Sequence, residues 1–137
     1  MKKPTHAARA ALTLTLLALS LNTQADWVEI ERFDDNTIVY ADATTVTREA
    51  DTAQLLHLVR WGAPQSDPGI PTYLSTVVRT AYDCTDKLEK YLASTAYTGA
   101  MGDGAKVIVD DEEARIWYTI SAASMEEKLW KLACGVN

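Results

Sequence analysis

The sequence predicts a small α+β domain, in which several strands precede one C-terminal helix and a disulfide joins Cys84 to Cys134. Three observations support this fold class. Short runs rich in β-branched and aromatic residues alternate with turn residues along most of the chain. A helix-capping pattern precedes the last apolar repeat. The chain contains two cysteines, an even number that favours one pair.

The N-terminal segment has the features of an export signal that is cleaved. A basic start and Arg9 precede an apolar run of about 12 residues, shorter than the roughly 20 that span a bilayer. Thr23 and Ala25 place small residues before a cleavage point. We therefore predict a signal peptide over residues 1–25 and a mature domain over 26–137, which is periplasmic or secreted. A disordered amphipathic leader or a membrane anchor is the alternative.

The first half of the mature chain reads as strands. Residues 27–33 and 37–40 flank an Asp-Asp-Asn turn, which predicts a hairpin. Residues 42–51 are polar, and we expect an irregular segment there, with a short helical turn around 44–46. Residues 54–61 carry apolar side chains on both faces, which is typical of a central strand.

The second half is punctuated by glycine and proline. Residues 62–71 form an expected loop, and 74–83 a strand. Residues 84–97 have apolar residues at helical spacing, so propensity alone favours a helix. Residues 106–109 and 115–120 are expected strands.

The C-terminal helix is signalled by a reciprocal capping pattern. Ser124 is followed three residues later by Glu127, and Met125 and Leu129 begin an apolar repeat at helical spacing. Gly135 is available to end the helix. We expect this helix to pack on the sheet.

Cys84 and Cys134 are expected to form a structural disulfide, because paired cysteines in an oxidising compartment are usually bonded. A redox-active pair or a metal site is the alternative, but these favour a Cys-x-x-Cys spacing or more Cys and His. In the strand, Val78 and Tyr82 point to the same side as Cys84. The element that carries Cys134 must approach that face.

The predicted mature domain is strongly acidic. Without the three basic residues of the leader it has 10 Lys and Arg against 19 Asp and Glu, a net charge of −9. Nucleic acids, anionic lipids and sulfated polysaccharides bind basic surfaces, so these partners are disfavoured. No second apolar stretch has the length of a membrane span, and we expect none after cleavage.

A set of short motifs runs in order along the mature chain. The motifs are Tyr40-x-Asp42, Val59-Arg60-Trp61, Ser75, Tyr82-Asp83-Cys84, Tyr97-Thr98-Gly99, Met101-Gly102-x-Gly104, Trp117, Leu129-Trp130 and Cys134. Together they resemble the surface-adhesin protein E-like family over nearly the whole mature chain. The resemblance implies an antiparallel sheet of about six strands with a C-terminal helix packed on one face. It also implies that 85–98 is a strand, and we follow it there because strand pairing often overrides local propensity.

The resemblance further implies a protein partner. The adhesin that gives the family its name is a surface lipoprotein that binds host extracellular-matrix and serum proteins. This chain departs from it in two respects. It lacks a lipidation cysteine near the cleavage point, and its loop 67–72 has no Lys or Arg, whereas the adhesin is basic in that region. The fold is therefore expected to carry over better than the ligand.

The residues do not predict an enzyme, a cofactor or a metal site. His57 is the single histidine of the mature chain, and a lone strand histidine is typical of packing rather than catalysis. Residues 110–113 lack the pattern of a calcium loop and read as a solvated turn. The glycines of 99–104 lack a phosphate-binding Lys-Ser or Lys-Thr. Paired carboxylates that hydrolyse glycosides remain a formal alternative.

The aromatic residues divide by position. Trp61, Trp117 and Trp130 lie in expected regular elements and are predicted to build the core. Trp27, near the mature N-terminus, and Tyr73, beside the long loop, are the expected exposed binding aromatics.

These features lead to three function classes. The first is a non-enzymatic binding domain for a host matrix or serum protein. The second is an interaction or stability factor for a cell-envelope complex, for which a homodimer through an exposed sheet edge is one form. The third is a carboxylate-based hydrolase.

Overall fold

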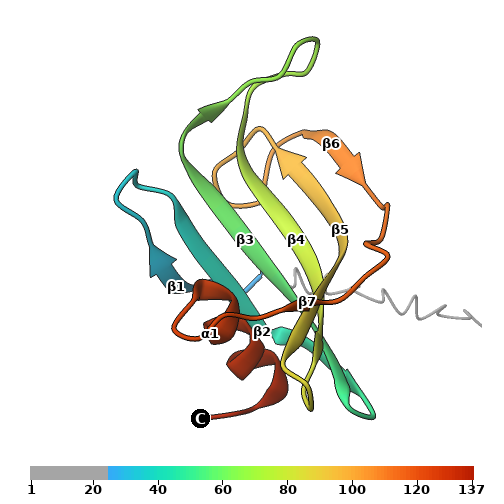
Figure 1. Cartoon of the computed structure of the whole chain (residues 1–137). Helices are drawn as coiled ribbons and strands as arrows, with labels where there is room; N and C mark the ends of the chain where they lie inside the picture. Colours follow the sequence, from blue (N-terminus) through green and yellow to red (C-terminus); the bar gives the residue numbers. More distant parts are fainter. Residues whose placement is uncertain (1–24) are drawn as a thin grey trace, which may run out of the picture.

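Six antiparallel strands form a sheet in the chain order β1-β2-β3-β4-β5-β6, and one helix lies across it (Figure 1). The computed structural model describes residues 25–137, so nearly all of the predicted signal peptide lies outside the described residues. The strands are β1 (Val28–Arg32), β2 (Ile38–Glu49), β3 (Thr52–Gln65), β4 (Tyr73–Asp83), β5 (Leu88–Tyr97), β6 (Lys106–Asp110) and the two-residue β7 (Tyr118–Thr119). The helix is α1 (Met125–Cys134). This arrangement confirms the predicted fold class.

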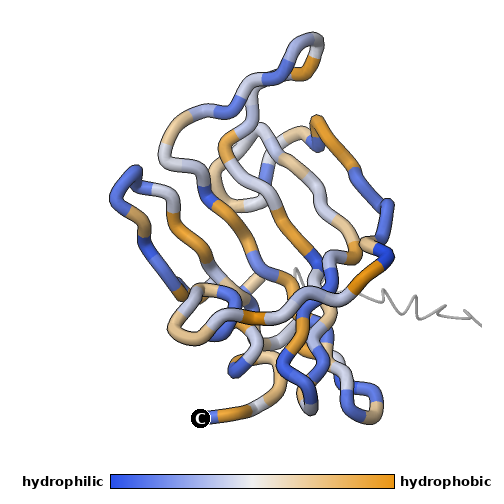
Figure 2. The backbone as a smooth tube through the Cα atoms, viewed as in Figure 1, coloured by the Kyte–Doolittle hydropathy of each residue, from blue (hydrophilic) through white to orange (hydrophobic). Residues whose placement is uncertain are grey.

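The described chain contains no helix of the length and hydrophobicity that a membrane crossing requires. Hydrophobic residues are concentrated along the central strands, and the connections between strands are mostly hydrophilic (Figure 2).

We expected the segment 42–51 to be irregular, but residues 42–49 form the second half of β2, and Ala50 and Asp51 form the turn that follows. This half of β2 pairs with the start of β3 from Thr47 to Glu49, after a register irregularity that begins at Asp42. The irregularity has a local cause, because the Asp42 carboxylate accepts hydrogen bonds from the backbone N–H and the hydroxyl of Thr44. The prediction was wrong because β-branched threonines fit a strand even where the segment is polar.

Residues 88–97 form a strand, as the family resemblance implied and against their helical spacing. A β-bulge explains why the sequence of this strand shows helical spacing. Tyr91 pairs with Thr80 and Ala93 with Arg79, so Leu92 is an extra residue between them. A bulge breaks the alternation of period two by one residue, and the sequence pattern then no longer looks like a strand.

The expected strand 115–120 is reduced to β7, which pairs with Leu88 and Glu89 of β5. The expected strand at 106–109 is confirmed as β6, which pairs with the other end of β5. β6 and β7 thus share one edge of β5. The connection between them, residues 111–117, leaves the sheet edge between these two pairings.

The core lies between α1 and one face of the sheet. Its buried members come mainly from β2, β3 and α1, and they are Val39, Ala41, Ala53, Leu55, Tyr82, Ile120, Leu129 and Ala133. Of the three tryptophans expected in the core, only Trp130 packs against this cluster. Trp61 and Trp117 are half-buried elsewhere, so that prediction was wrong for both. Burying a large apolar side chain stabilises a fold by about 1.5–3 kcal/mol.

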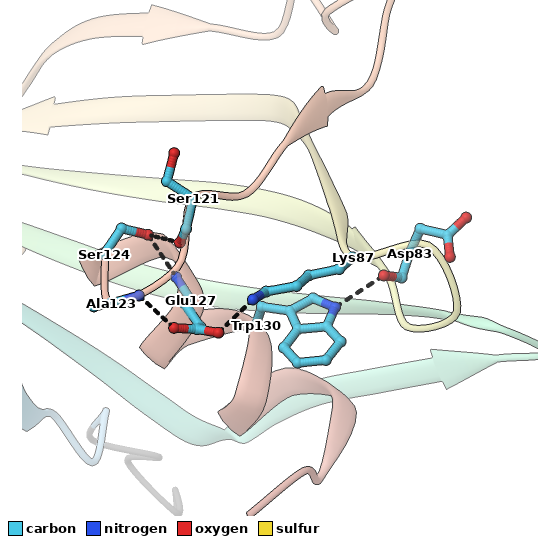
Figure 3. A network of polar contacts seen from close by, with 7 residues as sticks. All are labelled: Asp83, Lys87, Ser121, Ala123, Ser124, Glu127 and Trp130. Carbon is cyan, nitrogen blue, oxygen red and sulfur yellow. Dashed lines mark hydrogen bonds and ion pairs between the residues drawn. The ribbon is translucent and has the colours of Figure 1, made fainter.

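The start of α1 is fixed by the predicted capping residues (Figure 3). The Ser124 hydroxyl accepts a hydrogen bond from the Glu127 N–H at 3.1 Å. The Glu127 carboxylate reaches back to the N–H of Ala123, one residue earlier than the capping pattern predicts. The same carboxylate pairs with Lys87, whose ammonium lies 5.6 Å from the centre of the Trp130 ring. These contacts join the first turn of the helix to the β4–β5 connection.

The end of α1 is fixed by the disulfide. Cys84 and Cys134 are bonded with their Cα atoms 5.6 Å apart, which confirms the predicted bridge. Gly135 ends the helix in the left-handed conformation with φ 66°, as expected. The Arg48 Nε donates a 2.9 Å hydrogen bond to the carbonyl oxygen of Ala133. The helix is therefore anchored at both ends to the same face of the sheet.

Candidate functional site

The sheet has two faces of different character. One packs against α1, and we call the other the helix-free face. The helix-free face carries Gln54, Leu56 and Leu58 of β3 and, opposite them, Ala81, Arg79 and Val77 of β4. Because directly paired residues of an antiparallel sheet lie on the same side, this assignment follows from the register.

One end of the helix-free face is covered by the loop of residues 98–105. Ser75 organises this loop, because its hydroxyl donates to the Gly99 carbonyl oxygen at 2.6 Å and accepts from the Gly102 N–H at 2.9 Å. Gly102 adopts φ +71°, and an added Cβ would come within 3.0 Å of Val77 and 3.2 Å of Leu58. Glycine at this position therefore allows both the left-handed backbone and the close approach to the sheet.

The other end is bordered by residues 111–117. Together with β3, β4 and β5 this segment encloses a groove of about 460 Å³, which we call the Arg79 groove. The residues of the groove that carry charge, amide or aromatic character are Gln54, Arg79, Lys90, Asp111, Glu113 and Trp117. The groove lies within the size range of small-molecule and side-chain pockets.

The two cations of the Arg79 groove differ in their surroundings. Lys90 forms an ion pair with Glu113, and its ammonium lies 5.1 Å from the centre of the Trp117 ring. Arg79 is exposed, and its side chain forms no hydrogen bond or ion pair within residues 25–137. A guanidinium offers five donors in a planar fork that matches a carboxylate. Arg79 is thus the cation of the groove that has no ionic partner among residues 25–137.

The predicted binding aromatics lie elsewhere and are half-buried. Trp27 lines a second cavity of about 640 Å³, together with Val77, Met101 and Gly102. Tyr73 begins β4, and its hydroxyl donates a 3.3 Å hydrogen bond to Asp67 in the β3–β4 loop. Asp67 and burial both raise the pKa of the Tyr73 hydroxyl, with burial as the larger cause. Trp27 therefore adjoins the helix-free face, whereas Tyr73 lies at the start of β4, beside the hairpin loop.

Sequence reasoning missed Arg79 and Trp117 as site residues. The signal for Arg79 was available, because strand alternation places it on the side opposite Cys84, where it has no disulfide or helix to cover it. Nothing in the sequence showed that Trp117 leaves its strand. Among the residues that the structure describes, no three His, Cys, Asp or Glu side chains are placed to hold a metal ion.

Comparison with known proteins places the chain in a family. The sequence model described as "Surface-adhesin protein E" matches residues 27–135. The chain belongs to the surface-adhesin protein E family. No curated protein matches it in a sequence search.

Two crystal structures of Haemophilus influenzae protein E share the fold of this family member. The crystal form II structure has a TM-score of 0.65 and 10% sequence identity, and the alignment covers 83% of this chain and 91% of that one. The structure from non-typeable Haemophilus influenzae has a TM-score of 0.64 and 10% identity, with 87% and 82% covered. At this identity the likeness shows the fold alone. Ser75, Gly99 and Gly102, which are among the residues that carry the resemblance seen in the sequence, hold the loop on the helix-free face.

Proposed function

We propose that this protein is a non-enzymatic, periplasmic or secreted binding domain that docks an acidic segment of a protein partner in the Arg79 groove. The observation that carries the proposal is the exposed Arg79 side chain, which has no ionic partner in the described part of the chain. Of the nine other basic side chains in this part, four form ion pairs and five do not, and Arg79 is distinguished from the unpaired ones by its place in the lining of the groove. An acidic segment would supply the missing partner.

Charge and shape both support an acidic segment. The predicted mature domain has a net charge of −9, so most of its surface repels an acidic partner. In the groove the charges of Arg79 and Lys90 are balanced by Asp111 and Glu113, and because Lys90 is paired with Glu113, attraction of an acidic segment depends on Arg79. Trp117 borders the same groove, and Trp and Arg are the residues that most often dominate binding energy at interfaces. In this proposal the partner also contacts Trp27, at the end of the helix-free face that the loop 98–105 covers.

Two sources of partner follow from the family. Membership of an adhesin family supports a host matrix or serum protein as the partner. An exported location equally supports an envelope protein of the producing cell as the partner. A second copy of the chain is a further form of partner, through the edge strands β1 and β6, since each pairs on one side only along its length.

The test is a binding assay with protein expressed from the full-length sequence and exported. Immobilised protein is exposed in parallel to purified matrix and serum proteins and to an envelope extract, at physiological salt. For each ligand captured, Arg79→Gln is compared with Lys131→Gln. Lys131 is exposed on α1 and provides the same charge change away from the Arg79 groove.

Arg79→Gln is expected to weaken binding at least tenfold, which corresponds to about 1.4 kcal/mol. Lys131→Gln is expected to leave it unchanged. The affinity for the native protein should also fall as salt is raised. Equal affinities of the two variants would rule out the Arg79 groove as the docking site.

A further inference from the structure

Asp42, the acid of the Tyr40-x-Asp42 motif, is buried although it lies near the start of the described chain. Only 2% of the residue is exposed. Asp42 pairs with Leu56 of β3, which lies on the helix-free face, so the Asp42 side chain belongs to that face as well. Burial of a carboxylate costs free energy unless hydrogen bonds and a countercharge compensate it. The contacts of Asp42 therefore show what this position requires.

The Asp42 carboxylate accepts three hydrogen bonds, two from Thr44 and one from Asp26. The bonds from Thr44 go to Oδ1, and the backbone nitrogen of Asp26 lies 3.0 Å from Oδ2. Burial raises the pKa of Asp42, but these hydrogen bonds lower it by more, so the group is ionised at pH 7. None of the ion pairs within residues 25–137 includes Asp42. The hydrogen bonds are thus supplied, whereas a countercharge is not.

The nitrogen that contacts Asp42 belongs to the peptide bond of the predicted cleavage, between Ala25 and Asp26. Hydrolysis of this bond by a signal peptidase consumes one water molecule. It leaves a carboxylate on Ala25 and an amino group on Asp26, which is mostly protonated at pH 7. Cleavage therefore replaces a neutral N–H donor at Asp42 with an ammonium group at the same position.

The position of the new charge depends on which bond is cut. Consecutive Cα atoms are about 3.8 Å apart, so a cut one residue earlier or later would move the ammonium group away from the Asp42 oxygen by more than a hydrogen-bond length. The start of β1 fixes the approach of the chain, because Val28 pairs with Ala41, the neighbour of Asp42. The small residues before the cut and the buried carboxylate are independent observations, and both point to the amino group of Asp26.

We propose that Asp42 binds the α-ammonium group of the mature N-terminus, so that cleavage before Asp26 completes an ion pair that the uncleaved chain lacks. The ligand of this site is the terminal amine of the same chain. The ion pair ties the residues before β1 to β2 and holds Trp27, the next residue, beside the helix-free face. The proposal rests on the predicted cleavage and not on the Arg79 groove, because it requires no partner protein.

The first measurement is the N-terminal residue of the protein exported from the full-length sequence, by intact mass and N-terminal sequencing. Asp26 is expected, and a mature chain that begins at another residue overturns the proposal. A reference protein carries one valine inserted between Ala25 and Asp26. Valine is too large for the residue before a cut, so cleavage stays after Ala25. In the reference protein the Asp26 nitrogen remains an amide, and the terminal ammonium is one residue further from Asp42.

Asp42→Asn is then made in both proteins, and urea unfolding gives the equilibrium constant of unfolding for each. The substitution is expected to raise this constant at least tenfold more in the natural mature protein than in the reference protein, because the ammonium faces the carboxylate in the natural one alone. Asp34→Asn is the matched control, since Asp34 is an exposed acid of the β1–β2 turn, and its effect should be equal in both. Equal effects of Asp42→Asn in both would confine its role to the Thr44 hydrogen bonds and overturn the proposal.

The reactivity of the terminal amine tests the same contact without a change at Asp42, and it decides the matter if Asp42→Asn does not fold. Both proteins are acetylated at pH 7 with an activated acetate ester, and mass spectrometry of the N-terminal peptide gives the rate. An ammonium group held by a carboxylate is a poor nucleophile, so the natural protein should react at least tenfold more slowly than the reference protein. This difference should vanish in urea. Equal rates in the folded proteins, or a difference that persists after unfolding, would overturn the proposal.

Discussion

The Trp130 indole Nε1 donates a 2.9 Å hydrogen bond to the carbonyl oxygen of Asp83, the residue that precedes Cys84. This bond links α1 to the β4–β5 connection beside the disulfide. It explains why a tryptophan, rather than another large apolar residue, is placed at this helix position. The disulfide and this hydrogen bond therefore hold the helix at the same point of the sheet.

Trp130→Phe is expected to lower the free energy of unfolding by about 1–3 kcal/mol, because it leaves the Asp83 carbonyl without its donor and removes buried ring atoms. Urea unfolding followed by circular dichroism measures this change. Trp27→Phe is the matched control, since the Trp27 indole donates no hydrogen bond within the described residues. A loss of the same size in both variants would show that the hydrogen bond contributes nothing.

The disulfide is expected to contribute more than any single hydrogen bond. It closes a loop with a sequence separation of 50, for which the chain-entropy estimate is about 4 kcal/mol. The double variant Cys84→Ser/Cys134→Ser should therefore unfold at a clearly lower guanidinium concentration than the oxidised protein. Dithiothreitol should lower the unfolding midpoint of the native protein toward that of the double variant, and it should leave the midpoint of the variant unchanged. A midpoint of the native protein that does not respond to reductant would contradict this.

His57 makes stability depend on pH. Burial lowers its pKa in the folded protein to about 4 from the ordinary 6.5. Between these two values the unfolded chain binds a proton that the folded protein does not. The free energy of unfolding should therefore fall as pH decreases from 6.5 to 4, by a total of about 3 kcal/mol.

His57→Gln is expected to abolish this part of the pH dependence. Glu89 has a raised pKa, so its contribution to the free energy of unfolding changes with pH in the opposite direction. Because Glu89 is present in both proteins, this contribution cancels when they are compared. Urea unfolding of both proteins at several pH values between 7 and 4 tests the prediction. Parallel stability curves would show that His57 is not the responsible group.

Ser75 has an essentially fully buried side chain that makes two hydrogen bonds to the loop over the helix-free face. Ser75→Ala leaves the Gly99 carbonyl oxygen and the Gly102 N–H without these partners, and should destabilise the protein by about 2 kcal/mol. Amide hydrogen exchange should show lost protection at Gly102. Ser66→Ala, in the exposed β3–β4 loop, should change neither quantity. Retained protection at Gly102 in Ser75→Ala would argue against this role.

The sequence predicts the fold well where local chemistry and tertiary structure agree. The capping of α1 by Ser124 and Glu127 depends on residues that are neighbours in the chain, and it was predictable except that Glu127 accepts from the N–H of Ala123 instead of Ser124. Strand alternation also predicted that Cys84 and the helix share a face. The prediction of β5 as a strand depended on the family resemblance, because the bulge at Leu92 interrupts the alternation of its side chains.

The candidate sites were less predictable because they depend on contacts between distant segments. Trp117 borders the Arg79 groove only because residues 111–117 leave the sheet edge between β6 and β7. Glu89 and Glu126 are 37 positions apart, and both line one cavity of about 220 Å³. His57 was correctly expected to be packed, but the sequence has no signal for its unpartnered Nδ1.

The strand order of the sheet bears on how the disulfide forms. Each strand from β2 to β6 pairs with the strand that precedes it in the chain, so each pairing can form before the later strands are in place. Cys134 lies in α1, which follows all the strands. Cys84 therefore remains a lone thiol while the sheet is built, and with two cysteines in the chain no incorrect intramolecular bridge exists. The disulfide can form only when α1 has docked next to Cys84. A disulfide isomerase is therefore needed only to remove mixed disulfides with other molecules.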